Sequence, residues 1–155
     1  MPYSYRPHHF EDLEEGQTFE STGRTITETD VVNYAAIGGD WTELHTNTEY
    51  AASENFERRV AHGPLTLTVA LGLAYRCGFL ERTVQGFLGV DSMRFPEPVF
   101  IDDTVTGEFT VREKRTLETT SDSGVARLQF DLTNQDESQV FDSEMKFLVQ
   151  RRSDD

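Results

Sequence analysis

The sequence predicts an α+β domain, in which an antiparallel β-sheet packs on one buried α-helix. In the first half of the chain, apolar residues recur at helical spacing, and one stretch is apolar nearly all round. In the second half, four segments show in parts the alternation of apolar and polar residues that is typical of strands with one buried face. A chain of 155 residues is normally one domain, so we expect a single domain over residues 1–155, with an ordered core from about residue 10 to 150.

The first predicted elements are a strand and a capped helix. Residues 18–26 read as a strand that follows a polar approach over residues 11–16. Thr27 and Asp30 resemble a capping box, in which two side chains satisfy free amides at the start of a helix. The apolar residues that follow have helical spacing, and Gly38-Gly39 is expected to end this helix.

A loop and two further helices are expected next. Residues 40–47 read as a loop, after which Asn47 or Thr48 can cap a short helix. Gly63-Pro64 opens the longest apolar stretch of the chain, and proline is favoured in the first turn because its missing amide hydrogen costs nothing there. This stretch predicts a buried helix that ends near Gly78.

The second half of the chain predicts four strands of an antiparallel meander. They span residues 84–95, 104–117, 125–133 and 140–149. The segments between them have the composition of turns: residues 96–98, 121–124 and 134–137. A helix covers only one face of such a sheet, so the outer face and the edge strands remain exposed. A homodimer that pairs two sheets would cover them, and a larger oligomer stays possible.

The charge balance excludes some classes of partner. The chain has 28 acidic and 14 basic residues, a net charge of −14, and only two lysines, Lys114 and Lys146. Nucleic acids bind to clustered positive charge, so we expect no nucleic-acid partner. An acidic surface that is poor in lysine repels itself at ordinary ionic strength, which suggests a cytoplasm whose salt screens that repulsion. We therefore hypothesise an extreme halophile.

The sequence also indicates a compartment. No apolar run approaches the roughly 20 residues that a membrane span needs, so no membrane partner is expected. The first residues lack the charged and then apolar pattern of a signal peptide. Cys77 is the single cysteine, which rules out an intramolecular disulfide and a cysteine-based metal cluster. We expect a cytoplasmic protein.

Three residues that lie close in sequence combine into a chemical hypothesis. Asp40 and His45 stand in Gly-Gly-Asp-Trp-Thr-Glu-Leu-His, and Gly63 follows at the start of the predicted helix. A carboxylate and an imidazole can handle one water molecule, while a helix-start amide can hold an enolate oxygen. These are the parts needed to add water to a double bond next to a carbonyl. Asp40 alone would more often be a turn residue, and His45 alone an ordinary loop histidine.

The same residues belong to a wider pattern that resembles a known family. Gly39-Asp40 with His45, then Ala61-His62-Gly63 with Leu65, and then Met93-Arg94-Phe95-Pro96 with Pro98-Val99-Phe100, are similar to motifs of the MaoC-like dehydratases, the (R)-specific enoyl-CoA hydratases. The resemblance runs from about residue 10 to 149. The chain departs from the family at Thr42-Glu43, at Asn47 and at Leu71, where some hydratases carry a serine.

The resemblance implies a hot-dog fold, in which an antiparallel sheet wraps around a long central helix and two subunits join their sheets. It also implies that Asp40 and His45 are catalytic and that the Gly63 amide holds the thioester oxygen. No cofactor is expected, since coenzyme A is part of the substrate, and which of Asp40 and His45 is the formal base stays open. The acyl chain length, the pathway and the oligomer size also stay open.

Four further residues are assigned to the binding of an acyl-CoA substrate: Trp41, His62, Leu65 and Arg94. Trp41 can equally pack the loop, His62 can brace it, and Arg94 can simply point outward from a strand. Asp40, His45 and His62 could be imagined as metal ligands, but the sequence offers no residues to orient such ligands, so no metal is predicted.

Two other functions remain compatible with the sequence. One is a hot-dog acyl-CoA thioesterase, in which a carboxylate directs water at the thioester carbonyl. The other is a non-catalytic subunit that only binds acyl-CoA. The presence of both Asp40 and His45, together with Gly63, favours hydration.

Overall fold

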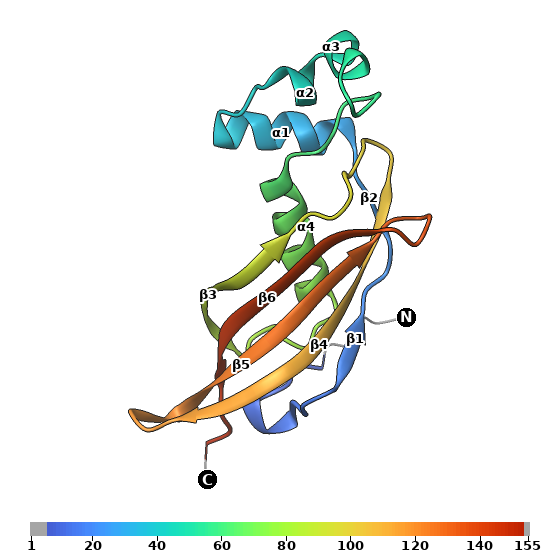
Figure 1. Ribbon diagram of the computed structural model, residues 1–155. Coiled ribbons are helices and arrows are strands. Elements are labelled where there is room, and N and C mark those ends of the chain that lie inside the picture. The colour runs from blue at the N-terminus through green and yellow to red at the C-terminus, as the bar shows by residue number, and fades with distance from the viewer. Residues whose placement is uncertain (1–5, 154–155) are drawn as a thin grey trace.

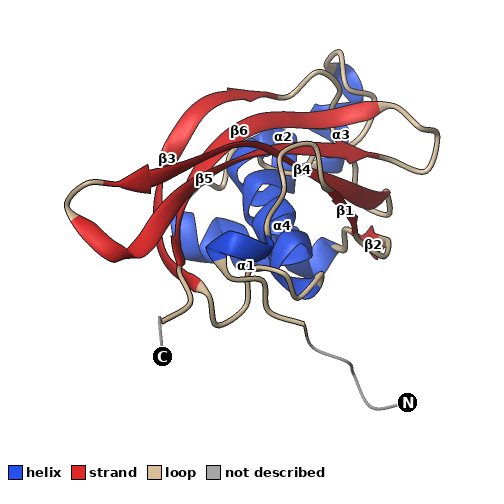
Figure 2. Cartoon of the chain, turned by 90° about the horizontal axis from the view of Figure 1, so that it is seen from below, coloured by secondary structure: helices blue, strands red, loops and turns tan. Residues whose placement is uncertain are grey.

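A curved antiparallel sheet wraps around one helix in the computed structural model, which describes residues 6–153. The central helix is α4, Gly63–Arg76, and it lies against the concave face of the sheet (Figures 1 and 2). Three shorter helices gather beyond one end of the sheet: α1 (Glu28–Gly38), α2 (Glu43–Thr46) and α3 (Thr48–Ser53) (Figure 1). The predicted α+β architecture is confirmed. Among residues 6–153, no helix is both long and apolar enough to cross a membrane.

Within residues 6–153, the sheet contains six strands, all paired antiparallel. Their order is β1-β4-β5-β6-β3, and β2 also pairs with β4. Strand β3 therefore lies at an edge, and among the described residues it pairs only with β6. The strands are β1 Thr18–Glu20, β2 Arg24–Thr25, β3 Val84–Arg94, β4 Thr104–Leu117, β5 Thr120–Thr133 and β6 Gln139–Gln150.

Alternating side chains of the long strands build the core, as the period-two pattern predicts. Residues on the concave face of β4, β5 and β6 are fully buried, among them Phe109, Val111, Leu128, Phe130, Leu132, Met145 and Phe147. They pack against the buried side of α4, which presents Val69, Ala70, Leu73 and Ala74. Burial of this apolar surface is the main favourable contribution to folding.

The helix signals before the site are confirmed in detail. Helix α1, Glu28–Gly38, begins at a capping box in which Thr27 accepts from the Asp30 amide and Asp30 accepts from the Thr27 amide. It ends at Gly39, which adopts the left-handed conformation with φ of 75° that favours glycine. Asn47 caps α3, Thr48–Ser53, by accepting from the Tyr50 amide. Helix α4 has its proline in the first turn and ends just before Gly78.

Two predicted elements near the site and the sheet edge were wrong in detail. Residues 18–26 form two short strands instead of one, because between Glu20 and Arg24 the chain has one residue more than the facing stretch of β4. Ser21 fills the interruption, since its hydroxyl accepts from the Gly107 amide at 2.8 Å. The predicted loop over residues 40–47 contains a one-turn helix, α2 Glu43–Thr46, whose end Asn47 fixes by donating to the Glu43 side chain.

The turn predicted at residues 121–124 was also wrong. Strand β5 begins at Thr120, and the turn lies at residues 118–119. Gly124 is not a turn residue: it leaves room for the Phe10 ring, which a Cβ atom at this position would overlap. Phe10 starts a short 3-10 helix, Phe10–Asp12, and its ring is buried in the core. The glycine therefore serves a close contact within the sheet.

Candidate active site

The loop after α1 presents the Asp40 carboxylate with one oxygen occupied and one free. Thr42 donates to Asp40 Oδ1 from its hydroxyl at 2.5 Å and from its amide at 3.1 Å. This side-chain-to-backbone turn is the structural role that an aspartate after two glycines suggests. The other oxygen, Oδ2, points to His45, whose Nε2 lies 3.7 Å away. Asp40 therefore takes part in both a turn and the candidate site.

The hydrogen bonds from Thr42 also set the ionisation of Asp40. The Thr42 hydroxyl, and then the Thr42 amide, hold the pKa of Asp40 below its ordinary value of 3.8. Positive charge on His45 or His62 would act in the same direction. The side chain is nearly half exposed, so water solvates the charged form as well. Asp40 is thus a carboxylate at neutral pH.

The ring of His45 has a fixed orientation. Its Nδ1 lies 2.7 Å from the carbonyl oxygen of Val60. A carbonyl can only accept, so Nδ1 carries the hydrogen and a neutral ring has its lone pair on Nε2. That nitrogen faces Asp40 across 3.7 Å, which is too long for a direct hydrogen bond and short enough for one shared water molecule.

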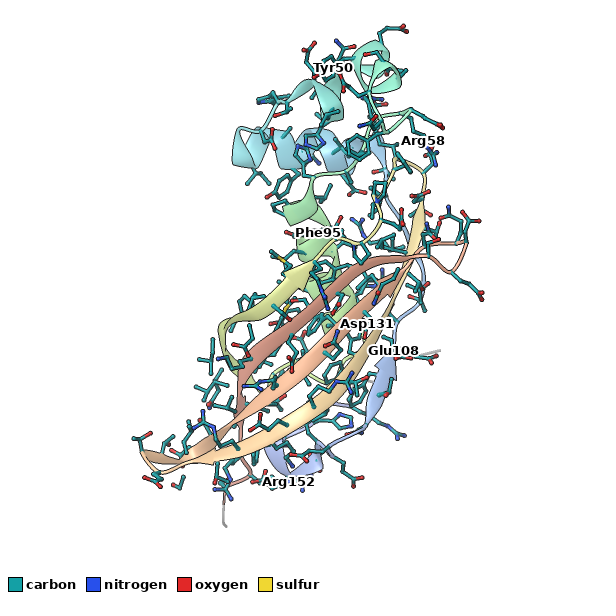
Figure 3. All side chains as sticks on the ribbon, viewed as in Figure 1. Tyr50, Arg58, Phe95, Glu108, Asp131 and Arg152 are labelled. Atoms are coloured by element: carbon teal, nitrogen blue, oxygen red, sulfur yellow. The ribbon has the colours of Figure 1, made fainter. Side chains whose placement is uncertain are left out.

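His45 and Gly63 line the same cavity. The cavity has a volume of about 420 Å³ and is lined by residues of the helical end, the start of α4, the segment after β3 and the start of β6: Leu44, His45, Phe56, Val60, Ala61, Gly63, Thr66, Phe95, Pro96, Glu97, Pro98, Val99 and Val140. Most of these side chains are apolar. Figure 3 shows Phe95 between the start of α4 and the end of β3.

Gly63 is suited to a close approach by a ligand. It is the first residue of α4, where an amide has no acceptor within the helix and the helix dipole is positive. A Cβ atom at this position would lie 3.3 Å from the Phe95 ring, so a larger residue would narrow the cavity. Pro64 has no amide hydrogen, so at these two positions Gly63 is the donor.

His62 lies behind these residues. Its side chain is 1% exposed, and its Nε2 donates to the carbonyl oxygen of Asp40 at 2.9 Å. Its ring stacks on His45, with centroids 3.8 Å apart. The cavity lining does not include it. The geometry agrees with bracing of the loop, and the assignment of His62 to substrate binding stays a prediction.

The other residues assigned to substrate binding are not among those that line the cavity. Trp41 is 53% exposed and is not among the lining residues. Leu65 is buried and lines a second hollow, of about 290 Å³, between α1 and α4. Arg94 lies at the end of β3, 76% exposed, and pairs with Asp142 at 2.8 Å. The contact of these three residues with a substrate stays a prediction.

Three contributors to the site were missed by the sequence analysis. The Thr42 hydroxyl holds Asp40, the Val60 carbonyl orients His45, and the Phe95 ring closes on Gly63. A threonine two residues after an aspartate was a signal for the first. The Arg-Phe-Pro segment was a signal for the third. Nothing in the sequence singles out a backbone carbonyl fifteen residues from the histidine.

The spacing of the polar groups also bears on metal binding. One ligand atom from each of Asp40, His45 and His62 lies within 4.8 Å of the others. His62 Nε2, however, carries a hydrogen that it donates to a carbonyl, and its other nitrogen is buried. Asp40 and His45 then supply two ligands, fewer than the three or four of usual zinc sites. The absence of a metal stays a prediction.

Comparison with known proteins decides the family. The sequence profile of the MaoC like domain matches residues 11–131, which include Asp40, His45 and Gly63. The chain belongs to the MaoC-like domain family. An (R)-specific enoyl-CoA hydratase from Rhodospirillum rubrum is 35% identical over 111 residues, which cover 67% of this chain and 69% of the relative. Protein MaoC from Klebsiella aerogenes is 35% identical over 106 residues, 68% of this chain, but these span only 31% of that longer protein.

Solved structures of similar proteins confirm the fold. A structure titled as a monoamine oxidase regulatory protein from Archaeoglobus has a TM-score of 0.87 at 31% identity, and the match covers 95% of this chain and 97% of that one. A Mycobacterium tuberculosis protein described as a double hot-dog fold has a TM-score of 0.85 at 21% identity, over 96% of this chain and 46% of its own. The predicted hot-dog fold of this MaoC-like domain is therefore confirmed.

Proposed function

We propose that this protein is an (R)-specific enoyl-CoA hydratase, which adds water to a trans-2-enoyl-CoA and catalyses the reverse dehydration. Membership of the MaoC-like family and the named hydratase relatives support a hydratase or dehydratase. The observation that supports it most is the shared cavity: His45 and Gly63 line one mainly apolar space, and Oδ2 of Asp40 lies 3.7 Å from Nε2 of His45. The reaction takes no cofactor beyond the CoA of the substrate.

Each group has a role in this reaction. One water molecule lies between Asp40 Oδ2 and His45 Nε2 and attacks Cβ of the enoyl thioester. The pair takes one proton from that water and returns a proton to Cα, so the product contains the substrate plus one water. Negative charge develops on the thioester oxygen, which receives a hydrogen bond from the Gly63 amide. The apolar lining keeps other water away from the enolate.

An assay with crotonyl-CoA separates this reaction from the two alternatives. The loss of the enoyl absorbance reports hydration, and a thiol reagent reports free CoA. We expect the absorbance to fall without release of thiol, and chiral analysis to give the (R)-3-hydroxy product. Release of thiol would establish a thioesterase instead. Binding of acyl-CoAs of several chain lengths without any turnover would establish a non-catalytic subunit.

We further propose that two copies pair through β3 to form a homodimer. This edge strand exposes apolar residues along its length and just beyond it, between 38% and 51% of each side chain: Phe87, Leu88, Val90, Met93 and Phe95. One side of the strand has no partner among residues 6–153. A second copy of β3 offers both the missing backbone hydrogen bonds and a matching apolar surface. Phe95 would place the cavity of each copy beside the interface.

A charge on the edge strand tests the dimer. In light scattering after size exclusion, we expect the unmodified chain to have the mass of two copies. Leu88→Glu should give a monomer, because the carboxylate would be buried without a partner. Ile37→Glu is a matched control, since Ile37 is 86% exposed on α1 and lies away from β3. A dimer that persists in Leu88→Glu would contradict pairing through this strand.

A further inference from the structure

His62 has an unusual position for a buried histidine. It is the residue immediately before α4, the position at which a polar side chain normally accepts from an amide of the first helical turn. The His62 side chain makes no such bond. Its ring is 1% exposed and turns toward Asp40, in the loop after α1, and toward His45, in α2. Capping of the helix therefore does not explain this residue.

The ring contacts both residues of the candidate catalytic pair. His62 Nε2 donates to the carbonyl oxygen of Asp40 at 2.9 Å, which holds the backbone of the loop. The face of the ring stacks on His45, with centroids 3.8 Å apart and planes 29° apart. The Tyr34 ring of α1 packs on His62 at 4.9 Å. His62 thus packs against Tyr34 of α1 and contacts two residues that precede it in the chain, Asp40 and His45.

The second nitrogen of His62 argues against a purely structural role. Nδ1 is buried and has no hydrogen-bond partner in the described part of the chain. An unpaired buried acceptor lowers stability, and a phenylalanine would fill the same space without that cost. A residue that is kept for packing alone would not need this nitrogen. The hydrogen bond from Nε2 to Asp40 is the feature that phenylalanine cannot reproduce.

We infer that His62 is a positioning residue that fixes the distance between the Asp40 carboxylate and the His45 imidazole. This inference rests on the proposed hydratase function. Asp40 directly follows two glycines, so its backbone needs an external contact to hold it. The two groups must share one water across 3.7 Å, and an error of about 1 Å in such an arrangement can lower a rate about 100-fold. The His62 ring holds Asp40 through a hydrogen bond to the Asp40 backbone carbonyl, and it holds His45 by stacking.

Two substitutions separate the hydrogen bond from the stacking. His62→Phe keeps a ring against His45 and removes the donor. His62→Gln removes the ring and keeps a nitrogen donor at a similar distance from the backbone. With crotonyl-CoA, we expect His62→Phe to lower kcat about 10- to 100-fold, to change KM less than about threefold and to leave Tm equal or higher. His62→Gln should recover at least part of kcat. His8→Phe is a matched control, because His8 also makes a ring contact but lies far from the site in sequence, at the start of the chain.

Other outcomes would overturn the inference. An unchanged kcat in His62→Phe, or a kcat that falls only with Tm, would mean that His62 serves packing. A raised KM with normal kcat would make it a substrate-binding residue instead.

Amide exchange tests the positioning without turnover. The Thr42 amide donates to Asp40, so it should exchange about 10-fold faster in His62→Phe, while the amides of α4 stay protected. If the unmodified chain does not hydrate crotonyl-CoA, the proposed function fails, and this exchange still decides whether His62 holds the loop. Unchanged exchange at Thr42 would refute that role.

Discussion

Replacement of Glu108 by glutamine tests whether the acidic surface of this protein depends on salt. Four carboxylates lie in register across the outer face of the sheet, with Glu20 facing Glu108, Glu108 facing Asp131 and Asp131 facing Asp142. Figure 3 shows Glu108 and Asp131 side by side on β4 and β5. Arg94 pairs with Asp142 at the end of the row. Glu108 therefore has a like charge on both sides.

The size of the effect follows from this register. Facing side chains on neighbouring strands have Cβ atoms about 5 Å apart. Two unit charges about 5.5 Å apart in water repel by about 0.75 kcal/mol without salt. Glu108→Gln removes two such repulsions, which raises the free energy of unfolding by about 1.5 kcal/mol at very low salt. For a chain of this size that corresponds to an increase in Tm of about 3–6 °C. At about 1 M salt the Debye length of about 3 Å leaves roughly a sixth of the repulsion.

The assay is thermal unfolding over a salt series. We expect the Tm of the unmodified protein to rise with salt concentration. The difference in Tm between Glu108→Gln and the unmodified protein should shrink over the same series. Glu118→Gln is the matched control: it removes one negative charge in the turn between β4 and β5, outside the row. An equal increase in Tm from both substitutions would mean that the effect comes from net charge and not from the row of facing carboxylates. A gain from Glu108→Gln that is the same at all salt concentrations would refute the electrostatic reasoning.

Three further predictions concern the site and the N-terminal segment. Asp40→Asn and His45→Ala should each lower the kcat for crotonyl-CoA by about 10²–10⁴-fold with the fold intact, checked by circular dichroism, and normal activity would remove that residue from the mechanism. Thr42→Val removes the hydroxyl donor to Asp40, so the pKa of Asp40 should rise and the acid limb of the pH–rate profile should move to higher pH. At Glu11, burial alone would raise the pKa. Hydrogen bonds from the Arg151 side chain and from the Arg152 amide outweigh that effect and lower the pKa from 4.5 to about 2. This contribution to stability is therefore present above about pH 4.5 and lost as the pH falls toward 2, and Glu11→Gln should flatten the Tm profile in that window.

Short-range signals predicted the fold well where the cause of an element is local. The Thr27–Asp30 capping box, the left-handed Gly39 and the helix start at Gly63-Pro64 are each decided by residues within a few positions of one another. Gly124 is different. The composition of residues 121–124 suggests a turn, but the glycine is explained by contact with Phe10, more than a hundred positions earlier. No local pattern could reveal that contact.

The candidate site shows the same division. The residue types and spacing of Asp40, His45 and Gly63 suggested one pocket, and the structure places His45 and Gly63 on one cavity with Asp40 beside His45. Leu65 was assigned to substrate binding because it belongs to the family-like motif that also contains Gly63. Residues two positions apart on a helix point to different faces. Leu65 therefore lies on another face of α4 than Gly63 and lines the hollow between α1 and α4. Orientation about the axis of α4 depends on what packs against it.

Asp40 shows why a structural and a catalytic role need not exclude each other. Thr42 occupies one carboxylate oxygen with two hydrogen bonds, and this fixes the side chain so that the other oxygen points at His45. An asparagine would keep the turn, because its single carbonyl oxygen can accept both bonds from Thr42. Its amide group would then face His45 and offer hydrogens where the reaction needs a lone pair. Asp40→Asn therefore separates the two roles: a folded protein without activity requires that the free oxygen does the chemistry while the bound one sets its direction.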